Sequence, residues 1–200
     1  MNAKNLQRLS RNFFKRNTEQ VAKDLIGRYI VRETENGKMI GKITEVEAYL
    51  GPNDKGCHSY NYKKTERTKI MYKIPGTHYI YLIYGMYHCL NVVTEEEGLP
   101  CAVLIRELYP IDGIDLMKKN RQIKIGKNYK NLVDGPGKLC MALDITKQKF
   151  NGKDSCKSVS RLYYTIGQSI DINHIESLKR IGIDYAGEDK DRLLRFRLKK

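Results

Sequence analysis

Two glutamates and a tyrosine near the start of the chain have a spacing that could support chemistry. If residues 43–49 form a strand, Glu45, Glu47 and Tyr49 lie on one face, and the small or apolar residues between them lie on the other. A carboxylate held in a cleft on that face could act as a general base on water. The alternative is that both glutamates face solvent and pair with lysine or arginine, and the periodicity alone leaves the two interpretations open.

Tyrosines are concentrated in the segment that follows. Eight of the 14 tyrosines fall between residues 49 and 87. A tyrosine ring can stack on a nucleobase and its hydroxyl can form a hydrogen bond, although ordinary packing explains many such residues. Tyr84 differs because it stands beside Gly85 at the expected tip of a hairpin, where a wedge role is more natural than a core role. His58 could donate or accept a hydrogen bond at a bound base, but a lone histidine is usually structural.

Positive charge predicts a polyanionic partner. The 200 residues carry 37 Lys and Arg against 23 Asp and Glu, a formal net charge of +14. Two basic groups consist of Lys63, Lys64, Arg67 and Lys69, and of Lys118, Lys119, Arg121, Lys124, Lys127 and Lys130. Either group alone could be a solvated face. Together they favour sequence-independent contacts with nucleic-acid phosphates, whose affinity should fall steeply with salt.

The composition bounds the class of protein. Hydrophobic residues make up 40% of the chain, enough for a packed core, and no apolar run approaches the ~20 residues that span a bilayer. The first residues lack the apolar stretch of a signal peptide, so we expect a single cytoplasmic domain over residues 1–200, nucleoid-associated if the source is bacterial. Five cysteines without CxxC spacing indicate reduced thiols, and we expect no metal and no cofactor.

The elements that must position these residues can be placed from the hydrophobic pattern and the turn signals. Thr18 is expected to cap a helix that Gly27 ends, and Asn36-Gly37 is expected to turn one hairpin. Strands are predicted from Tyr29, over 38–47 with a bulge at Gly41, over 78–83 and 87–93 around a turn at 84–86, over 101–107, and as an edge strand over 193–198. Helices are predicted over 18–26, 113–120 and 137–143. This order predicts a mixed α/β (α+β) fold with a largely antiparallel sheet.

Seven motifs occur in order along nearly the whole chain. They are Thr44–Gly51, Cys57–Ser59, Pro75–Thr77, Tyr79–Val92, Val103–Arg106, Gly135–Cys140 and Arg180–Glu188. In this set the sequence resembles the alkyladenine (3-methyladenine) DNA glycosylases, the mammalian-type family. The resemblance implies one domain with a curved antiparallel sheet and a hairpin that protrudes into the minor groove of double-stranded DNA.

The resemblance also implies an activity. A member would act as a monomer in base-excision repair, flip an alkylated or deaminated purine (3-methyladenine, 7-methylguanine or hypoxanthine) out of the duplex, and hydrolyse its N-glycosidic bond without cutting the strand. Carried over by motif, Glu47 is the general base and Arg106 helps to hold the attacking water. The other matching positions are Tyr49, His58 and Tyr81, which sandwich or hydrogen-bond the base, Asn91, which excludes normal purines, and Tyr84, which intercalates.

Three positions depart from the family pattern, and a second class of function stays open. Thr68 stands where asparagine is frequent, Asp189 replaces a tryptophan and Leu193 replaces a proline, which puts substrate range and local packing in question. A non-catalytic nucleic-acid-binding protein on the same fold is the alternative. The set of Glu47, Arg106 and Tyr84 favours the enzyme, because a carboxylate beside DNA phosphates contributes nothing to a protein that only binds nucleic acid.

Overall fold

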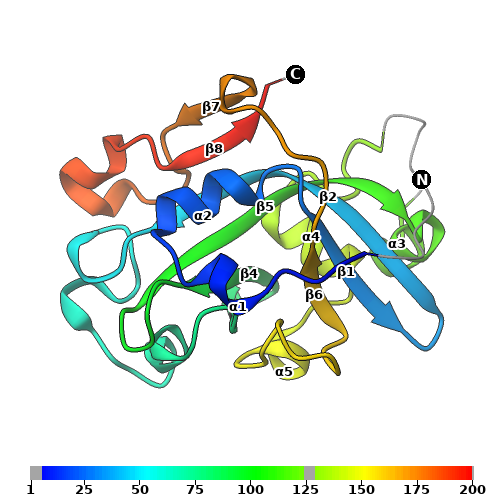
Figure 1. Ribbon diagram of the computed structural model, residues 1–200, viewed down its shortest axis with the longest axis horizontal. Helices are drawn as coiled ribbons and strands as arrows, with labels where there is room; N and C mark the ends of the chain where they lie inside the picture. The colour runs from blue at the N-terminus through cyan, green and yellow to red at the C-terminus, as the bar shows by residue number, and fades with distance from the viewer. Residues whose placement is uncertain (1–5, 124–128, 200) are drawn as a thin grey trace.

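Eight antiparallel strands form one curled sheet in the computed structural model, which describes residues 6–123 and 129–199 (Figure 1). The strands are β1 (Tyr29–Thr34), β2 (Gly37–Tyr49), β3 (His78–Ile83), β4 (Tyr87–Thr94), β5 (Cys101–Asp112), β6 (Leu162–Thr165), β7 (Ile175–Leu178) and β8 (Arg195–Leu198). The main path through the sheet runs β3-β4-β5-β2-β1-β6. This arrangement confirms the mixed α/β class with an antiparallel sheet.

Strand β2 is the axis of the sheet because it pairs on both edges. One edge pairs with β5 along nearly its whole length, while the other pairs with β1 over residues 37–42 and then with β8 over residues 45–47. The expected irregularity at Gly41 is confirmed by a shift in the β2–β5 register between Ile40 and Gly41. A Cβ on Gly41 would lie 2.8 Å from the Leu108 side chain, so glycine allows the two strands to approach here.

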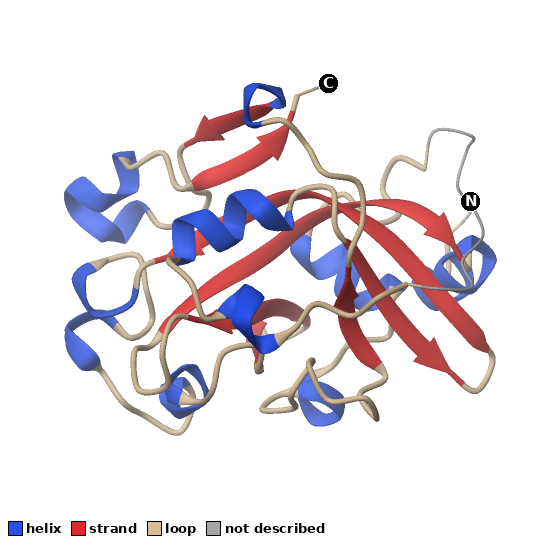
Figure 2. Cartoon of the chain, in the orientation of Figure 1, coloured by secondary structure: helices blue, strands red, loops and turns tan. Residues whose placement is uncertain are grey.

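Short helices surround the sheet (Figure 2). The α-helices are α1 (Arg11–Phe14), α2 (Thr18–Leu25), α3 (Ile114–Arg121), α4 (Pro136–Ala142) and α5 (Lys147–Phe150). The 3₁₀ helices cover Gly51–Asn53, Tyr60–Tyr62, Thr68–Tyr72, Ile172–His174 and Asp184–Asp191. Helix α2 packs on β2 and β5, and α4 packs on β4 and β5. Their apolar residues therefore bury one face of the sheet and leave the other face available for a site.

Two local predictions in the first part of the chain were wrong. Asn17, not Thr18, caps α2, since its side chain accepts hydrogen bonds from the N–H groups of Glu19 and Gln20, while the Thr18 hydroxyl bonds Glu95 at 2.7 Å. The first hairpin turns one residue earlier than expected: Glu35 and Asn36 form the turn, and Gly37 begins β2 at a φ of 126°.

The expected edge strand is also wrong. Strand β8 begins only at Arg195 and is paired on both sides, by β2 and by β7. The missing partner, β7, was not predicted because Ile-Glu-Ser-Leu is too short to show a strand pattern, and β6 was missed for the same reason.

A buried histidine makes the fold sensitive to acid. His78 is fully buried, its ring lies 5.7 Å from that of Tyr164, and neither ring nitrogen has a hydrogen-bond partner among the described residues. Burial lowers the pKa of His78 from 6.5 to about 3, so the unfolded chain takes up a proton below pH 6.5 that the folded chain does not. The contribution of neutral His78 to the free energy of unfolding is therefore fully present above pH 6.5 and is lost as the pH drops.

When the pH falls from 7 to 5, we expect proton uptake by His78 in the unfolded chain to lower the free energy of unfolding by roughly 2 kcal/mol. Urea denaturation at both pH values should show that the loss is smaller by that amount in His78→Leu than in the wild type. An equal loss in the two proteins would assign the acid sensitivity to other groups.

Candidate active site

Alternate residues on neighbouring strands line a cavity of about 510 Å³ on the face of the sheet away from the main core. The lining residues include Tyr49 from β2, Tyr79 and Tyr81 from β3, Asn91 from β4 and Arg106 from β5. Residues an odd number of positions away on the same strands belong to the main core: Val46, Ala48, Ile80, Leu90, Val92, Val103 and Ile105. The two-residue period of the strands therefore separates the core from the site.

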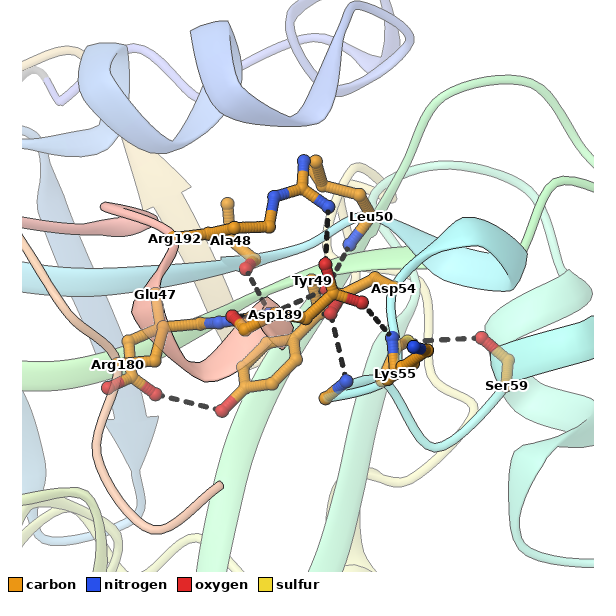
Figure 3. Close-up of polar contacts among 12 residues, drawn as sticks. Glu47, Ala48, Tyr49, Leu50, Asp54, Lys55, Ser59, Arg180, Asp189 and Arg192 are labelled. Atoms are coloured by element: carbon orange, nitrogen blue, oxygen red, sulfur yellow. Dashed lines mark hydrogen bonds and ion pairs between the residues drawn. The ribbon is translucent and has the colours of Figure 1, made fainter. Parts of the chain in front are cut away.

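Glu47 is fully buried and does not itself line the cavity, but its three hydrogen-bonded or ionic partners, Ile181, Arg106 and Tyr49, all do. Its Oε1 accepts the backbone N–H of Ile181 at 2.8 Å and lies 3.2 Å from Nη1 of Arg106. Its Oε2 accepts the Tyr49 hydroxyl at 2.9 Å, a contact drawn in Figure 3. Burial raises the pKa of Glu47, against the opposing effects of Arg106, the Ile181 amide and Tyr49. A raised pKa makes the carboxylate a better acceptor for a proton from water.

Arg106 joins the two glutamates of the strand. Its Nε donates to Oε1 of Glu45 at 3.0 Å while its Nη1 faces Glu47, and Arg195 contacts the same Glu45 oxygen at 3.1 Å. Both glutamates do pair with arginine, but neither faces solvent, since Glu47 is 0% and Glu45 only 6% exposed. The solvent-facing interpretation of these carboxylates is therefore wrong.

A buried ion pair supports Tyr49 from behind (Figure 3). Arg180 donates from Nη1 and Nη2 to the two carboxylate oxygens of Asp54 at 2.5 and 2.7 Å, and neither side chain is exposed. Nη1 also donates to the Ala48 carbonyl at 3.0 Å, and the guanidinium carbon lies 4.8 Å from the centre of the Tyr49 ring. The pair therefore fixes Tyr49 and the chain that carries the Ile181 N–H.

Sequence reasoning missed this pair. Asp54 lies in Gly-Pro-Asn-Asp-Lys-Gly, which has the composition of a turn, and Arg180 is 126 positions away along the chain. The only available signal was that both residues lie in or close to motifs of the resemblance, which does not reveal that they touch.

His58 forms part of the aromatic wall and is held from both sides. Its Nδ1 lies 3.0 Å from the Tyr79 hydroxyl, and its Nε2 lies 3.1 Å from Nη2 of Arg67. Because a guanidinium only donates, Nε2 accepts and the ring proton is assigned to Nδ1. Burial, together with the charges of Arg67 and Lys63, lowers the pKa of His58 to about 4. The ring is neutral at pH 7, which favours hydrogen bonding over acid catalysis.

Arg67 and Asn91 complete the wall. The Arg67 guanidinium lies 4.7 Å from the centre of the Tyr81 ring and lines the cavity, whereas the sequence placed it only in a phosphate-binding group. Asn91 is 3% exposed, and its Nδ2 donates to the carbonyls of Tyr79 and Cys89 at 3.1 and 3.4 Å. These backbone contacts fix the orientation of the Asn91 amide.

Tyr84 stands at the tip of the β3–β4 hairpin, as predicted, and also lines the cavity. Its side chain is 81% exposed and its φ is 53°, in the left-handed region that non-glycine residues rarely adopt. The tip of the hairpin thus holds a large aromatic ring in solvent. Exposed rings of this size at a hairpin tip are typical of contact surfaces.

The other sequence predictions have mixed outcomes. In the two basic groups, Lys69 pairs with Glu66 and Lys118 with Asp115, while Lys124 and Lys127 lie outside the described residues. The three residues that depart from the family pattern do not line the cavity. Thr68 donates to the Lys63 carbonyl, Asp189 accepts the Lys55 N–H, and Leu193 is exposed.

Two further observations concern the described residues only. Within 6–123 and 129–199, no helix has the length and apolar character needed to cross a membrane. In the same ranges no group of three or more His, Cys, Asp and Glu side chains is placed to hold a metal ion, and the five cysteines are free, with four of them buried.

Comparisons with known proteins agree along the chain. Residues 12–200 match the profile of the methylpurine-DNA glycosylase family. A candidate 3-methyladenine DNA glycosylase of Clostridium novyi (strain NT) is 51% identical, covering 97% of this chain and 96% of its own. Proteins of the same description from Alkaliphilus oremlandii (strain OhILAs) and Methanocella arvoryzae are each 46% identical, covering 96% and 94% of this chain and 96% and 90% of their own. The chain therefore belongs to the methylpurine-DNA glycosylase family and is a DNA glycosylase, a hydrolase of N-glycosyl bonds.

Proposed function

We propose that this protein removes alkylated or deaminated purines, such as 3-methyladenine, 7-methylguanine and hypoxanthine, from double-stranded DNA with a water activated by Glu47. The observation that carries the proposal is the buried Glu47 carboxylate, which is held beside an aromatic cavity by Arg106, Tyr49 and the Ile181 N–H. A fully buried carboxylate with these partners is costly to maintain for structure alone.

The cavity suits a flipped purine. Tyr49, His58 and Tyr81 supply flat aromatic surfaces in a space of about 510 Å³. A purine alkylated on a ring nitrogen is cationic, and an aromatic wall attracts such a base by about 1–2 kcal/mol when water is excluded. Because His58 is neutral at pH 7, it adds no repulsion toward that cation. We assign the rejection of normal purines to Asn91, and its backbone contacts, which fix the amide, support this role.

The chemistry assigned to Glu47 has two parts. As the glycosidic bond breaks, its electron pair leaves with the purine: a cationic alkylated base departs neutral, and hypoxanthine departs as an anion that takes a proton from solvent. The sugar gains oxocarbenium character, which the negative carboxylate stabilises. Glu47 then takes a proton from the water that attacks the sugar, and Arg106 keeps the carboxylate ionised and helps to hold the water. No lysine is required as a Schiff-base nucleophile, so the product is an intact strand with an abasic site.

A cleavage assay tests this proposal. Purified protein is incubated with duplexes that contain hypoxanthine, 3-methyladenine or 7-methylguanine. We expect abasic sites that break only after alkali treatment. Binding to these duplexes without any abasic site would support the alternative of a non-catalytic nucleic-acid-binding protein, and strand breaks before alkali would contradict the monofunctional reaction.

We further propose that one protein molecule approaches the minor groove and inserts Tyr84 into the gap left by the flipped nucleotide. Stacking of an aromatic ring on a base contributes about 1–3 kcal/mol, so Tyr84→Ser is expected to reduce single-turnover excision roughly tenfold to a hundredfold. A fluorescent base analogue at the flipped position should show a smaller flipped population with this variant.

Leu82→Ser provides the matched control, because Leu82 is 45% exposed on the same hairpin but does not line the cavity. We expect wild-type flipping from it. Equal flipped populations in the wild type and Tyr84→Ser would remove the wedge role.

A further inference from the structure

A second cavity, of about 880 Å³, lies between the β1–β2 hairpin, the segment before β3, and α5 with the loop that follows it. It shares no lining residue with the cavity beside Glu47. In Figure 1, α5 and the turn of the β1–β2 hairpin lie at the lower side of the view, away from β7 and β8. The reaction proposed above makes no use of this cavity.

The charged side chains around the second cavity are mainly basic. They comprise Arg32, Lys73, Lys149, Lys153, Lys157 and Arg161 against Glu35, Asp144 and Asp154. Two of the acids are already engaged, Asp154 by Arg11 at 2.6 Å and Asp144 by Lys149 at 2.5 Å.

Four of the six bases face the cavity without a counter-charge. Among the described residues, no hydrogen bond or ion pair engages the side chains of Lys73, Lys153, Lys157 or Arg161. A concave wall with unpaired positive charge concentrates anions, because the surrounding protein focuses the field.

Arg32 is the buried member of this set and is poorly satisfied. Its side chain is only 8% exposed, and its Nε has no hydrogen-bond partner among the described residues. Its Nη1 donates to the Glu33 carbonyl, and its Nη2 reaches Asp144 only at 3.3 Å, a carboxylate that Lys149 holds more closely. A buried cation normally requires a close partner and filled hydrogen-bond positions. Arg32 therefore shares its only carboxylate partner among the described residues, Asp144, with Lys149, and the Phe150 ring 4.7 Å from its guanidinium carbon offers no negative charge.

We propose that this cavity is a second anion site, which binds phosphate groups. Arginine and lysine around one concavity recognise phosphate oxygens through charge-assisted hydrogen bonds, and the arginine fork matches two such oxygens. The cavity is much larger than a single inorganic ion, which favours a ligand with more than one phosphate. A free polyphosphate and the backbone of a nucleic acid present the same chemistry, and the test below separates them.

Amide chemical shifts of residues 149–161 test the proposal in the full-length protein at low salt. One arm titrates inorganic pyrophosphate, and the other titrates a tetrathymidylate. We expect saturable shifts in the wild type and about tenfold weaker binding in the variant Lys153→Gln/Arg161→Gln, which removes two exposed charges and leaves Arg32 in place. The control Lys42→Gln/Lys190→Gln removes two charges outside both cavities and should bind as the wild type does.

The outcomes are distinct. Saturation by pyrophosphate alone supports the site and identifies free polyphosphates as its ligands. Saturation by tetrathymidylate, with or without pyrophosphate, supports the site and identifies a nucleic-acid backbone. The absence of saturable shifts with both probes, or equal weakening by the control variant, would overturn the proposal. The titration does not measure base excision, so the anion site and the proposed glycosylase mechanism can fail independently of each other.

Discussion

Replacing Glu47 by glutamine is expected to slow base excision by roughly a thousandfold while binding of damaged duplex persists. Glutamine has nearly the same shape and can still accept the Tyr49 hydroxyl or the Ile181 N–H, so the pocket should remain formed. It cannot take a proton from water, and it offers no negative charge to the oxocarbenium-like sugar. Single-turnover excision and a gel-shift assay on the same hypoxanthine duplex measure the two properties separately.

Glu45→Gln is the comparison that isolates this role. Glu45 is also buried, lies on the same face of β2 and also pairs with Arg106, but it contacts neither Tyr49 nor the Ile181 N–H. We expect a loss well below that of Glu47→Gln. If the two variants lost activity equally, the charge of the cluster rather than the Glu47 base would control the rate, and an active Glu47→Gln would exclude the general-base role.

Removing the charge of Asp54 should cause the largest loss of stability, about 3–5 kcal/mol of unfolding free energy. Asp54→Asn leaves the fully buried Arg180 guanidinium without its counter-ion. It also places an NH₂ group among donors, because the Asp54 carboxylate accepts the N–H groups of Leu50 and Gly56 as well as both Arg180 contacts. Equilibrium urea denaturation at pH 7 measures the effect.

A surface pair provides the control for this experiment. Asp24 bonds Arg16 at 2.8 Å, but both side chains are about one-third exposed, so Asp24→Asn should cost less than about 1 kcal/mol. Adding Arg180→Met to Asp54→Asn should recover part of the lost stability by removing the stranded charge. A loss below 1 kcal/mol in Asp54→Asn would show that Arg180 reaches other partners or water.

The elements that carry the site could be predicted from sequence where local signals were strong. The hairpin of residues 78–93 follows from alternating apolar residues around a glycine-containing turn, and the structure confirms it. Alternation along residues 43–49 correctly placed Glu45, Glu47 and Tyr49 on one face. Both features depend on interactions between residues close in the chain, which a single sequence expresses directly.

Long-range packing decided what the sequence left open. Periodicity placed two glutamates on one face of a strand but did not show whether that face meets water, because that depends on residues from β5 and on the segment after β7. Contacts between distant segments are likewise not visible in the periodicity, so the Arg180–Asp54 pair was missed. For the same reason Arg67 was predicted to bind phosphate, whereas it lies in the cavity wall beside His58. The wrong cap at Thr18 has a similar cause, since Glu95 occupies the Thr18 hydroxyl.

By itself, then, the sequence determined the family, the sheet class and the identity of the groups that can do chemistry, because these depend on residue types and local order. Only the tertiary structure decided the protonation of the site. Glu47 has a raised pKa because segments distant in the chain exclude water from it, against the opposing charge of Arg106. His58 has a lowered pKa because it is also shielded from water and because Arg67 lies beside it. Desolvation and charge proximity are properties of the folded chain, and no pattern of residues along the sequence specifies them.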